Sequence, residues 1–222
     1  KTGYRHHTER LLNAVAGAFD PHSTYMSPKH REDFDIGMSG SLEGIGAVLT
    51  VDGHYIKVLR IVRGSASWRQ GELEAGDRIL AVAQKGAEPI DVADMPLDDA
   101  VRMIRGKKGT VVELTVQKPD GRKTRIAITR DIVRIEATYA MGGLLRPQKA
   151  PGTPAIGYIE LPGFYGNTRS SGKKAADRRC GDDVKKLITK LREAGATSLI
   201  LDLRSNSGGL LDEARKITGF FI

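Results

Sequence analysis

Apolar residues near the start of the chain recur every three or four positions between residues 4 and 19, which predicts an amphipathic helix. Asp20-Pro21 ends this helix, because the residue before a proline is disfavoured in the α region. Ser27 and Pro28 then have the residue types of a helix N-cap and first helical position, which predicts a short second helix through Phe34. His22 lies in the turn between the helices. It is either a catalytic base or, as we favour, a histidine that hydrogen-bonds neighbouring backbone.

From Leu42 the pattern changes to short apolar runs separated by turn residues, which is typical of strands. The predicted strands cover residues 47–51, 55–62, 78–82, 111–117 and 124–129. Asp52-Gly53 joins the first two strands as a hairpin turn. A short capped helix is predicted at 64–68, and a longer one from Pro96 or Leu97 to Ile104. The apolar stripe of the longer helix consists of Leu97, Ala100, Val101 and Ile104.

The composition changes beyond Val133, and the last third of the chain alternates strand and helix patterns. The expected order is loop at Gly142-Gly143 and at 147–154, strand 155–161, helix 182–194 and strand 198–203, followed by a further helix. Continuous apolar residues in 198–203 predict a strand of the buried parallel type. Strand, helix and strand then form a right-handed βαβ unit. The polar, basic segment from Gly166 to Cys180 has no apolar periodicity and is expected to be a mobile surface insertion.

The composition is that of a soluble globular protein, with 40% hydrophobic and 28% charged residues. No apolar run approaches the roughly 18 residues of a membrane span, so no transmembrane segment is expected. The chain begins with Lys1, which indicates a processed or trimmed sequence, so a targeting segment would be missing. A net charge of +8 permits anionic partners, but only 5% of residues are aromatic, and we expect no nucleic-acid partner. The single Cys180 has no His or Cys neighbours, so neither a metal nor another cofactor is expected.

Gly44 and Gly46 stand immediately before the first predicted strand. Two such glycines allow consecutive N–H groups to converge on an anion, such as the carboxylate at the end of a peptide. The following strand would then offer an edge to which that peptide adds as a further strand. A nucleotide phosphate is the weaker alternative, because the third glycine of that motif is replaced by Leu49 and a strand follows instead of a helix. A glycine turn that binds nothing is the remaining alternative.

A second glycine pair, Gly208-Gly209, follows the last predicted strand and precedes a helix. Backbone N–H groups at such a position point into the cleft at the carboxyl end of a sheet, so we interpret Gly208 and Gly209 as candidates for an oxyanion hole. Ser207 as a nucleophile is the weaker alternative. The glycine that a nucleophile elbow needs two positions earlier is Ser205, and no histidine follows His54.

The order of elements from Leu42 to Thr129 resembles a PDZ domain. The resemblance rests on the stretch 42–49, on the turn and strand 73–80, and on the helix 97–104. It implies a partly open β-barrel with two helices, which binds the C-terminal tails of proteins. The implied peptide-binding residues are Leu42, Glu43, Gly44, Ile45, Gly46, Ala47, Val48, Leu49, Leu97, Val101 and Ile104. In the PDZ pattern Ile45, Ala47 and Leu49 face Val101 and Ile104 across an apolar pocket, with Leu97 beside them. For the helix stripe alone, core packing is the simpler interpretation.

The whole chain resembles the carboxy-terminal processing, or tail-specific, serine proteases, which join a PDZ domain to an α/β protease core. Four segments carry this resemblance: Asp20–Tyr25, Leu42–Leu49, Ile159–Tyr165, and Asp202–Gly209 with its Asp-Leu-Arg-x-Asn-x-Gly-Gly pattern. The segment Ile159–Tyr165 is similar to the first core strand of the long bacterial branch of the family. The resemblance implies a multi-domain α+β and α/β chain. Its parts are an N-terminal helical segment (1–36), a PDZ domain (37–133) and the beginning of the protease core (134–222), with a basic loop at 166–181.

The same resemblance implies a periplasmic serine endopeptidase that recognises apolar C-terminal tails and cleaves through a Ser–Lys dyad. In the family both dyad residues follow the Gly-Gly loop, so neither can be assigned here, and we interpret Lys216 as a surface lysine. We therefore predict that this chain alone does not cleave peptides. An adaptor protein is a further partner that the family allows. The alternative function is a non-catalytic PDZ scaffold or regulatory module, which would explain residues 42–104 but not the Gly208-Gly209 loop.

Overall fold

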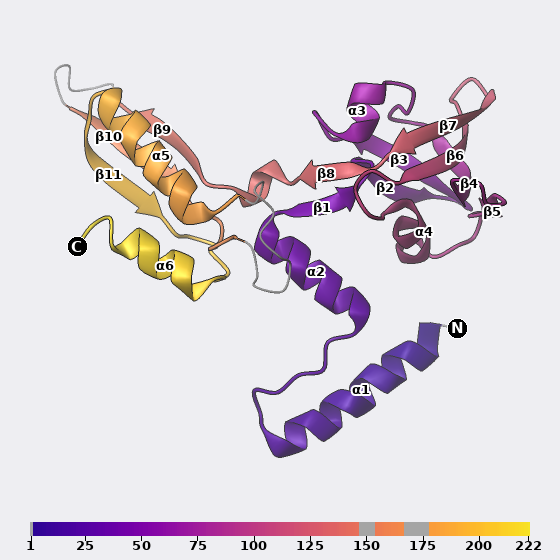
Figure 1. Cartoon of the computed structure of the whole chain (residues 1–222), viewed down its shortest axis with the longest axis horizontal. Coiled ribbons are helices and arrows are strands. Elements are labelled where there is room, and N and C mark those ends of the chain that lie inside the picture. Colours follow the sequence, from indigo (N-terminus) through magenta and orange to yellow (C-terminus); the bar gives the residue numbers. More distant parts are fainter. Residues whose placement is uncertain (1, 147–153, 167–177) are drawn as a thin grey trace. The chain divides into compact units, whose positions relative to one another are not determined.

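The computed structural model describes residues 2–146, 154–166 and 178–222. These residues form two compact units (Figure 1). One unit is continuous and comprises Ser41–Ile135, and the other combines Lys1–Gly40 with Glu136–Ile222. The boundaries predicted from the sequence, at residues 36/37 and 133/134, stay predictions.

The second unit begins with the helices α1 (Thr2–Phe19) and α2 (Pro28–Ser39). The predicted N-cap of α2 is confirmed, since the Ser27 side chain accepts the N–H of His30 at 3.4 Å. However, α2 does not end at Phe34 as predicted but continues to Ser39. It ends at Gly40, which has a left-handed φ of 67° and closes the last turn by donating to Ile36. His22 lies in an exposed turn, where its backbone N–H donates to Asp20.

The continuous unit is a twisted sheet with short strands and two helices. The strands of this unit are β1 (Ser41–Gly44), β2 (Ala47–Asp52), β3 (Tyr55–Ile61), β4 (Arg78–Gln84), β5 (Ile90–Asp91), β6 (Val111–Gln117), β7 (Lys123–Thr129) and β8 (Asp131–Arg134). Its helices are α3 (Ala66–Gln70) and α4 (Leu97–Ile104). The main sheet has the order β2-β3-β4-β6-β7 with β5 beside β4, while β1 pairs only with β8. The five strands and two helices predicted in this region are confirmed.

Three strands of this unit were not predicted. The strand β5 has two residues, and β1 and β8 have four each, which is too short for a periodic pattern. Strands β1 and β8 exist because they pair with each other, antiparallel, from Ser41 opposite Arg134 to Gly44 opposite Asp131. Such a contact between residues ninety positions apart leaves no local signal in the sequence.

The unit that contains the C-terminus has a sheet of three strands in the order β11-β10-β9. Its elements are the 3-10 turn Glu136–Thr138, β9 (Met141–Leu145), β10 (Ala155–Glu160), α5 (Cys180–Glu193), β11 (Ala196–Asp202) and α6 (Leu211–Thr218). Strands β10 and β11 are parallel and α5 connects them, as predicted, whereas β9 is antiparallel to β10. Figure 1 shows α5 lying across this sheet.

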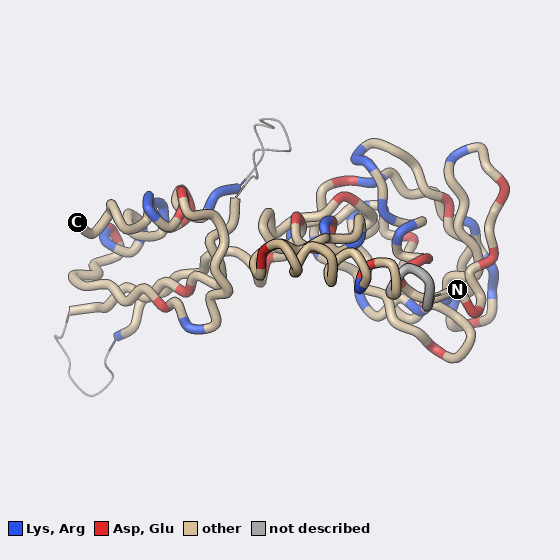
Figure 2. The backbone as a smooth tube through the Cα atoms, turned by 90° about the horizontal axis from the view of Figure 1, so that it is seen from below, with Lys and Arg blue, Asp and Glu red and all other residues tan. Residues whose placement is uncertain are grey.

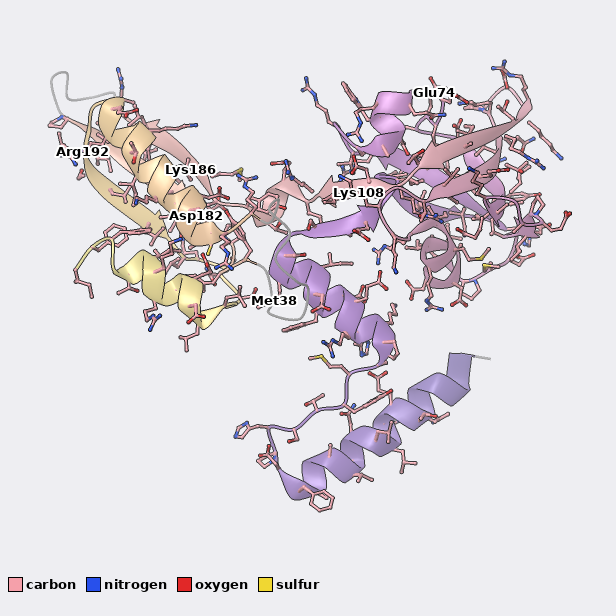
Figure 3. The ribbon with its side chains drawn as sticks, viewed as in Figure 1. Met38, Glu74, Lys108, Asp182, Lys186 and Arg192 are labelled. Atoms are coloured by element: carbon pink, nitrogen blue, oxygen red, sulfur yellow. The ribbon has the colours of Figure 1, made fainter. Side chains whose placement is uncertain are left out.

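Two predictions for this sheet are wrong. Gly142 and Gly143 do not form a loop but lie within β9, and a Cβ on Gly142 would approach the Leu187 side chain to 3.1 Å. The glycine therefore serves the close packing of α5 on the strand. Strand β11 is not buried throughout, because α5 covers only one face of the sheet, and Ile200 on the other face is 45% exposed. Figure 3 shows Asp182, Lys186 and Arg192 along α5, from its first turn to its last.

Cys180 was placed in the basic insertion, but it is the first residue of α5 and fully buried. Its burial, and then the nearby Glu213 carboxylate, raise the pKa of the thiol to about 12, so the thiol is uncharged and unreactive at neutral pH. Most of the predicted insertion, residues 167–177, lies outside the described residues, as do residues 147–153 of the predicted loop. No helix in the part of the chain that the structure describes is long and apolar enough to span a bilayer.

Candidate peptide-binding groove and glycine loop

The predicted carboxylate loop is shorter than the stretch 42–49, because its first residues belong to a strand. Leu42, Glu43 and Gly44 form β1 and pair with β8, and Ala47 already begins β2. Only Ile45 and Gly46 connect the two strands. Gly44 has no left-handed φ, whereas Gly46 has a φ of 80°. Of the two glycines, only Gly46 therefore needs glycine's conformational freedom, which the sequence pattern predicted for both.

The backbone of Ile45 and Gly46 is oriented with its carbonyl groups toward the protein. The Ile45 oxygen accepts the N–H of Ser67 at 2.9 Å, and the Gly46 oxygen accepts the N–H of Val62 at 2.8 Å. The Ser65 hydroxyl also donates to Gly46, at 3.3 Å. By contrast, the N–H groups of Ile45 and Gly46 have no hydrogen-bond acceptor among the described residues. Two consecutive N–H donors without a partner are what an anion-binding backbone nest requires.

Strand β2 follows directly and lies at the edge of its sheet, with β3 on one side only. Since β1 turns away to pair with β8, no described strand occupies the other side of β2. This confirms the predicted free strand edge. An extended peptide could pair there through main-chain hydrogen bonds, with its terminal carboxylate near Ile45 and Gly46.

Helix α4 lies close to β2 and forms the opposite wall of the predicted groove. Its Ala100 and Ile104 are buried in the same core as Ile45, while Ala47, Leu49 and Leu97 pack against that core and remain half-buried. Val101 is also half-buried but lies outside the core cluster. The apolar stripe of α4 therefore divides into core residues and residues with remaining surface. This division agrees with the two roles that the PDZ resemblance gives to one helix.

A buried arginine holds the C-terminal end of α4. Arg130 is 3% exposed, and its guanidinium donates to the carbonyl oxygens of Ile104 at 2.8 Å and Met103 at 3.0 Å. It also donates to Gln84 and Thr110. Burial lowers the pKa of Arg130, although it stays charged. This contact is not predictable from the sequence, because position 130 follows a strand and carries no signal of its partner helix.

The second predicted site begins at Asp202, the last residue of β11. Its carboxylate accepts hydrogen bonds from the Arg204 backbone and guanidinium at 2.7–3.0 Å and from the Tyr158 hydroxyl. Arg204, and then Tyr158, hold the pKa of Asp202 well below its usual range, so the carboxylate is ionised at any physiological pH. Tyr158 was not predicted to take part. The strand register pairs Tyr158 with Ile200 and Glu160 with Asp202. Tyr158 therefore reaches the Asp202 carboxylate diagonally, from two residues away, and the sequence alone does not indicate this contact.

The loop after Asp202 is fixed by Asn206 and by the backbone of Phe164. Asn206 donates its side-chain amide to Leu161 at 2.9 Å and accepts the N–H of Gly208 at 2.8 Å. Phe164 donates its N–H to Gly208 at 2.8 Å and accepts the N–H of Leu210 at 2.8 Å. Gly209 has a φ of 138°, and a Cβ there would lie 2.4 Å from the Phe164 oxygen. A side chain at Gly209 would therefore clash with the backbone of Phe164, and Gly208, with a φ of 99°, also favours glycine.

The two predicted oxyanion donors differ in this conformation. The N–H of Gly208 is already bonded to Asn206, whereas that of Gly209 has no acceptor among the described residues. Ser207 is exposed, and its hydroxyl has no hydrogen-bond partner within the ranges that the structure describes. Within the described residues, no group of three or more histidine, cysteine, aspartate or glutamate side chains is arranged so that it could hold a metal ion. Of the two glycines, only Gly209 thus has an N–H group without an acceptor among the described residues, and the oxyanion role of both glycines stays a prediction.

Comparison with known proteins identifies both parts of the chain. Residues 33–117 match the family model of the PDZ domain, and residues 155–222 match that of peptidase family S41. The chain therefore joins a PDZ domain to part of an S41 peptidase domain. It is 39% identical over 213 residues to the tail-specific protease of Haemophilus influenzae, and 31% identical over 203 residues to the carboxy-terminal processing protease CtpA of Bacillus subtilis. On this basis, the chain belongs to the family of carboxy-terminal processing, or tail-specific, proteases.

The aligned regions cover most of this chain but a minor part of each relative. They include 95% of this chain and 28% of the Haemophilus protein, and 91% of this chain and 38% of the Bacillus protein. Among solved structures, the peptide-bound PDZ domain of a carboxy-terminal protease from Vibrio cholerae is 40% identical. That match covers 42% of this chain and 98% of the other, with a TM-score of 0.41.

Proposed function

We propose that this chain is the PDZ-containing part of a serine endopeptidase that recognises apolar C-terminal tails of proteins and hydrolyses peptide bonds further inside them. In this proposal the N–H groups of Ile45 and Gly46 bind the tail carboxylate, and the tail pairs with β2. The last side chain of the tail lies between β2 and α4, near Val101. The support comes from the family membership together with the arrangement of the loop, the strand edge and the helix.

One observation carries the proposal: two consecutive backbone N–H groups, for which the described residues offer no acceptor, stand at the start of an edge strand. A backbone N–H group without an acceptor in the protein needs water or a ligand as its hydrogen-bond partner. Ile45 and Gly46 are both buried residues. A bound carboxylate would satisfy both donors at once with charge-assisted hydrogen bonds.

Fluorescence anisotropy tests the proposal with a labelled peptide that ends in alanines, in a free-carboxylate and an amidated form. We expect binding of the free form, at least tenfold weaker binding of the amidated form, and loss of binding in Val101→Asp. Lys123→Asp, on β7, serves as a control for the added charge and should bind like the wild type. Equal affinity for both peptide forms would contradict the proposal. Carboxylate-dependent binding without proteolysis in the whole protein would favour the PDZ scaffold instead.

The chemical step is part of the same proposal. The nucleophile and base of a Ser–Lys dyad would come from parts of the protein that this chain does not contain, and Gly209, with Gly208 once its N–H is released, would stabilise the oxyanion. The isolated chain should then cleave no peptide. If the purified chain cleaves a peptide and Ser207→Ala abolishes this activity, the proposal that the nucleophile lies outside this chain is refuted. A periplasmic location and an adaptor protein for the parent enzyme also belong to the proposal.

A further inference from the structure

A peptide that adds to β2 presents successive side chains to opposite faces of the sheet. On β2, Ala47 and Leu49 point to the core and α4, whereas Val48 and Thr50 point to the outer face. If the last side chain of the tail lies on the α4 side, as the proposed function requires, the penultimate side chain lies on the outer face. This inference rests on that proposed function and extends it to the second residue of the substrate.

The outer face next to this position is basic. Arg60 lies on β3 directly opposite Val48, and Lys57 lies opposite Thr50. Lys57 is 3.6 Å from Asp52, which also accepts two hydrogen bonds from Arg78. Arg60, by contrast, is exposed and has no carboxylate partner among the described residues. Figure 2 shows the basic and acidic positions of the unit interleaved along the backbone.

The side chains of Arg60 and of an acidic penultimate residue are together long enough to meet. Neighbouring strands are 4.7–4.9 Å apart, so a peptide strand beside β2 would lie roughly 9.5 Å from β3. An extended arginine and a glutamate together span this distance. The residue between them is Val48, whose short side chain leaves room for an ion pair above it. Leu59 is the extra residue of a bulge next to Arg60, and the bulge increases the local twist of the strand.

We propose that Arg60 is a specificity-determining residue that favours tails with an acidic penultimate side chain. The ion pair gives a preference and not a strict requirement, because an exposed ion pair contributes little to the binding free energy and is weakened by salt. A basic penultimate side chain would be disfavoured by the same cation. The substrate class is therefore protein tails in which an acidic residue precedes a small apolar C-terminal residue.

The test uses three labelled peptides with a free C-terminal alanine, identical except for Glu, Gln or Lys at the penultimate position. Their dissociation constants are measured by anisotropy at low and at high salt. For the wild type we expect the Glu peptide to bind about two- to fivefold more tightly than the Lys peptide at low salt, and this ratio to decrease with salt. Arg60→Gln should bring the ratio close to one, and Arg60→Glu should invert it.

The control is Arg122→Glu, which makes the same change of charge in the exposed turn between β6 and β7 and should keep the wild-type ratio. A ratio of one in the wild type, or a ratio that Arg60→Glu and Arg122→Glu change equally, would overturn the inference. The Gln peptide separates the two proposals. If the Gln peptide binds only with a free carboxylate, but the Glu and Lys peptides bind equally well, only the proposed role of Arg60 in specificity fails. If it does not bind, or binds equally when amidated, the proposed function fails, and this inference with it.

Discussion

Gly46 and Ser65 approach each other so closely that a Cβ on Gly46 would lie 2.1 Å from the Cβ of Ser65. The Ser65 hydroxyl donates to the Gly46 carbonyl and accepts the N–H of Trp68, so one side chain fixes both the loop and the first turn of α3. This contact sets the orientation of the peptide group that precedes Ala47. The free donors of the loop therefore depend on a glycine at position 46.

Gly46→Ala should disrupt the loop, because it adds a Cβ where Ser65 leaves no room and where φ is 80°. The left-handed conformation alone costs an alanine roughly 1–2 kcal/mol. We expect a lower free energy of unfolding and loss of peptide binding. Gly44→Ala is the matched control, since its Cβ would make only ordinary contacts at 3.4 Å or more and its φ is not left-handed. Chemical denaturation measures the free energy of unfolding, and fluorescence anisotropy measures peptide binding. Equal behaviour of the two variants would contradict the account of the loop.

The hydrogen bond from Gly208 to Asn206 makes a prediction about amide exchange. In Asn206→Ala the N–H of Gly208 loses its acceptor, so its exchange with solvent should become at least tenfold faster. Asn206→Asp keeps an acceptor oxygen at this place and should keep the protection. Amide hydrogen exchange followed by NMR compares the three chains. Unchanged exchange in the alanine variant would show that the side chain of Asn206 does not hold Gly208.

Tyr165 is the centre of a buried network in the unit with the C-terminus. Its hydroxyl donates to Asp183 at 2.5 Å and accepts the N–H of Ala140 at 3.1 Å, and Arg178 donates to the same Asp183 oxygen at 2.6 Å. Tyr165→Phe leaves a buried N–H and a buried carboxylate without this partner. We expect a loss of about 1–3 kcal/mol in the free energy of unfolding. Tyr25→Phe, on an exposed side chain, is the control and should change it by less than about 0.5 kcal/mol.

Asp131 gives the PDZ unit a defined dependence on pH. Its carboxylate is 2.8 Å from Lys108 and 2.6 Å from Arg69 and accepts the N–H of Ile132. The hydrogen bond from Lys108, and then that from Ile132, lower its pKa from 3.8 to about 2. Because the folded pKa lies below the ordinary value, the stabilisation is complete above pH 3.8 and is lost as the pH falls through about 2.

Asp131→Asn should therefore destabilise the unit at neutral pH by at most about 1 kcal/mol, as for other partly exposed ion pairs. The difference from the wild type should shrink below pH 3.8 and vanish near pH 2. Urea unfolding of both chains at several pH values measures it. A difference that stays constant down to pH 2 would contradict the role of the ionised carboxylate.

The sequence predicted the elements that have a local pattern of their own. Strands such as β6, and helix α4 with its apolar stripe, follow from the alternation and spacing of their residues. It did not predict β1, β8 or β9, because these are short or glycine-containing and depend on partners far away in the chain. The end of α2 was placed five residues too early, since nothing before Gly40 requires the helix to stop.

The candidate site was predictable in its position but not in its contacts. Gly46, Gly208 and Gly209 lie in loops, as the sequence predicted, and each has a positive φ that favours glycine, whereas Gly44 belongs to β1. The sequence could not show that Ser65 excludes a side chain at 46 or that Asn206 occupies the N–H of Gly208. Those contacts are set by the packing of separate elements.

The central claim is that the N–H groups of Ile45 and Gly46 bind the carboxylate of a peptide tail. The most direct measurement is an NMR titration of the ¹⁵N-labelled chain with a peptide in its free-carboxylate and amidated forms. The account predicts that the amide protons of Ile45 and Gly46 shift downfield with the free form, as expected for new charge-assisted hydrogen bonds, and change little with the amidated form. Equal shifts with both forms, or shifts confined to other residues, would contradict it.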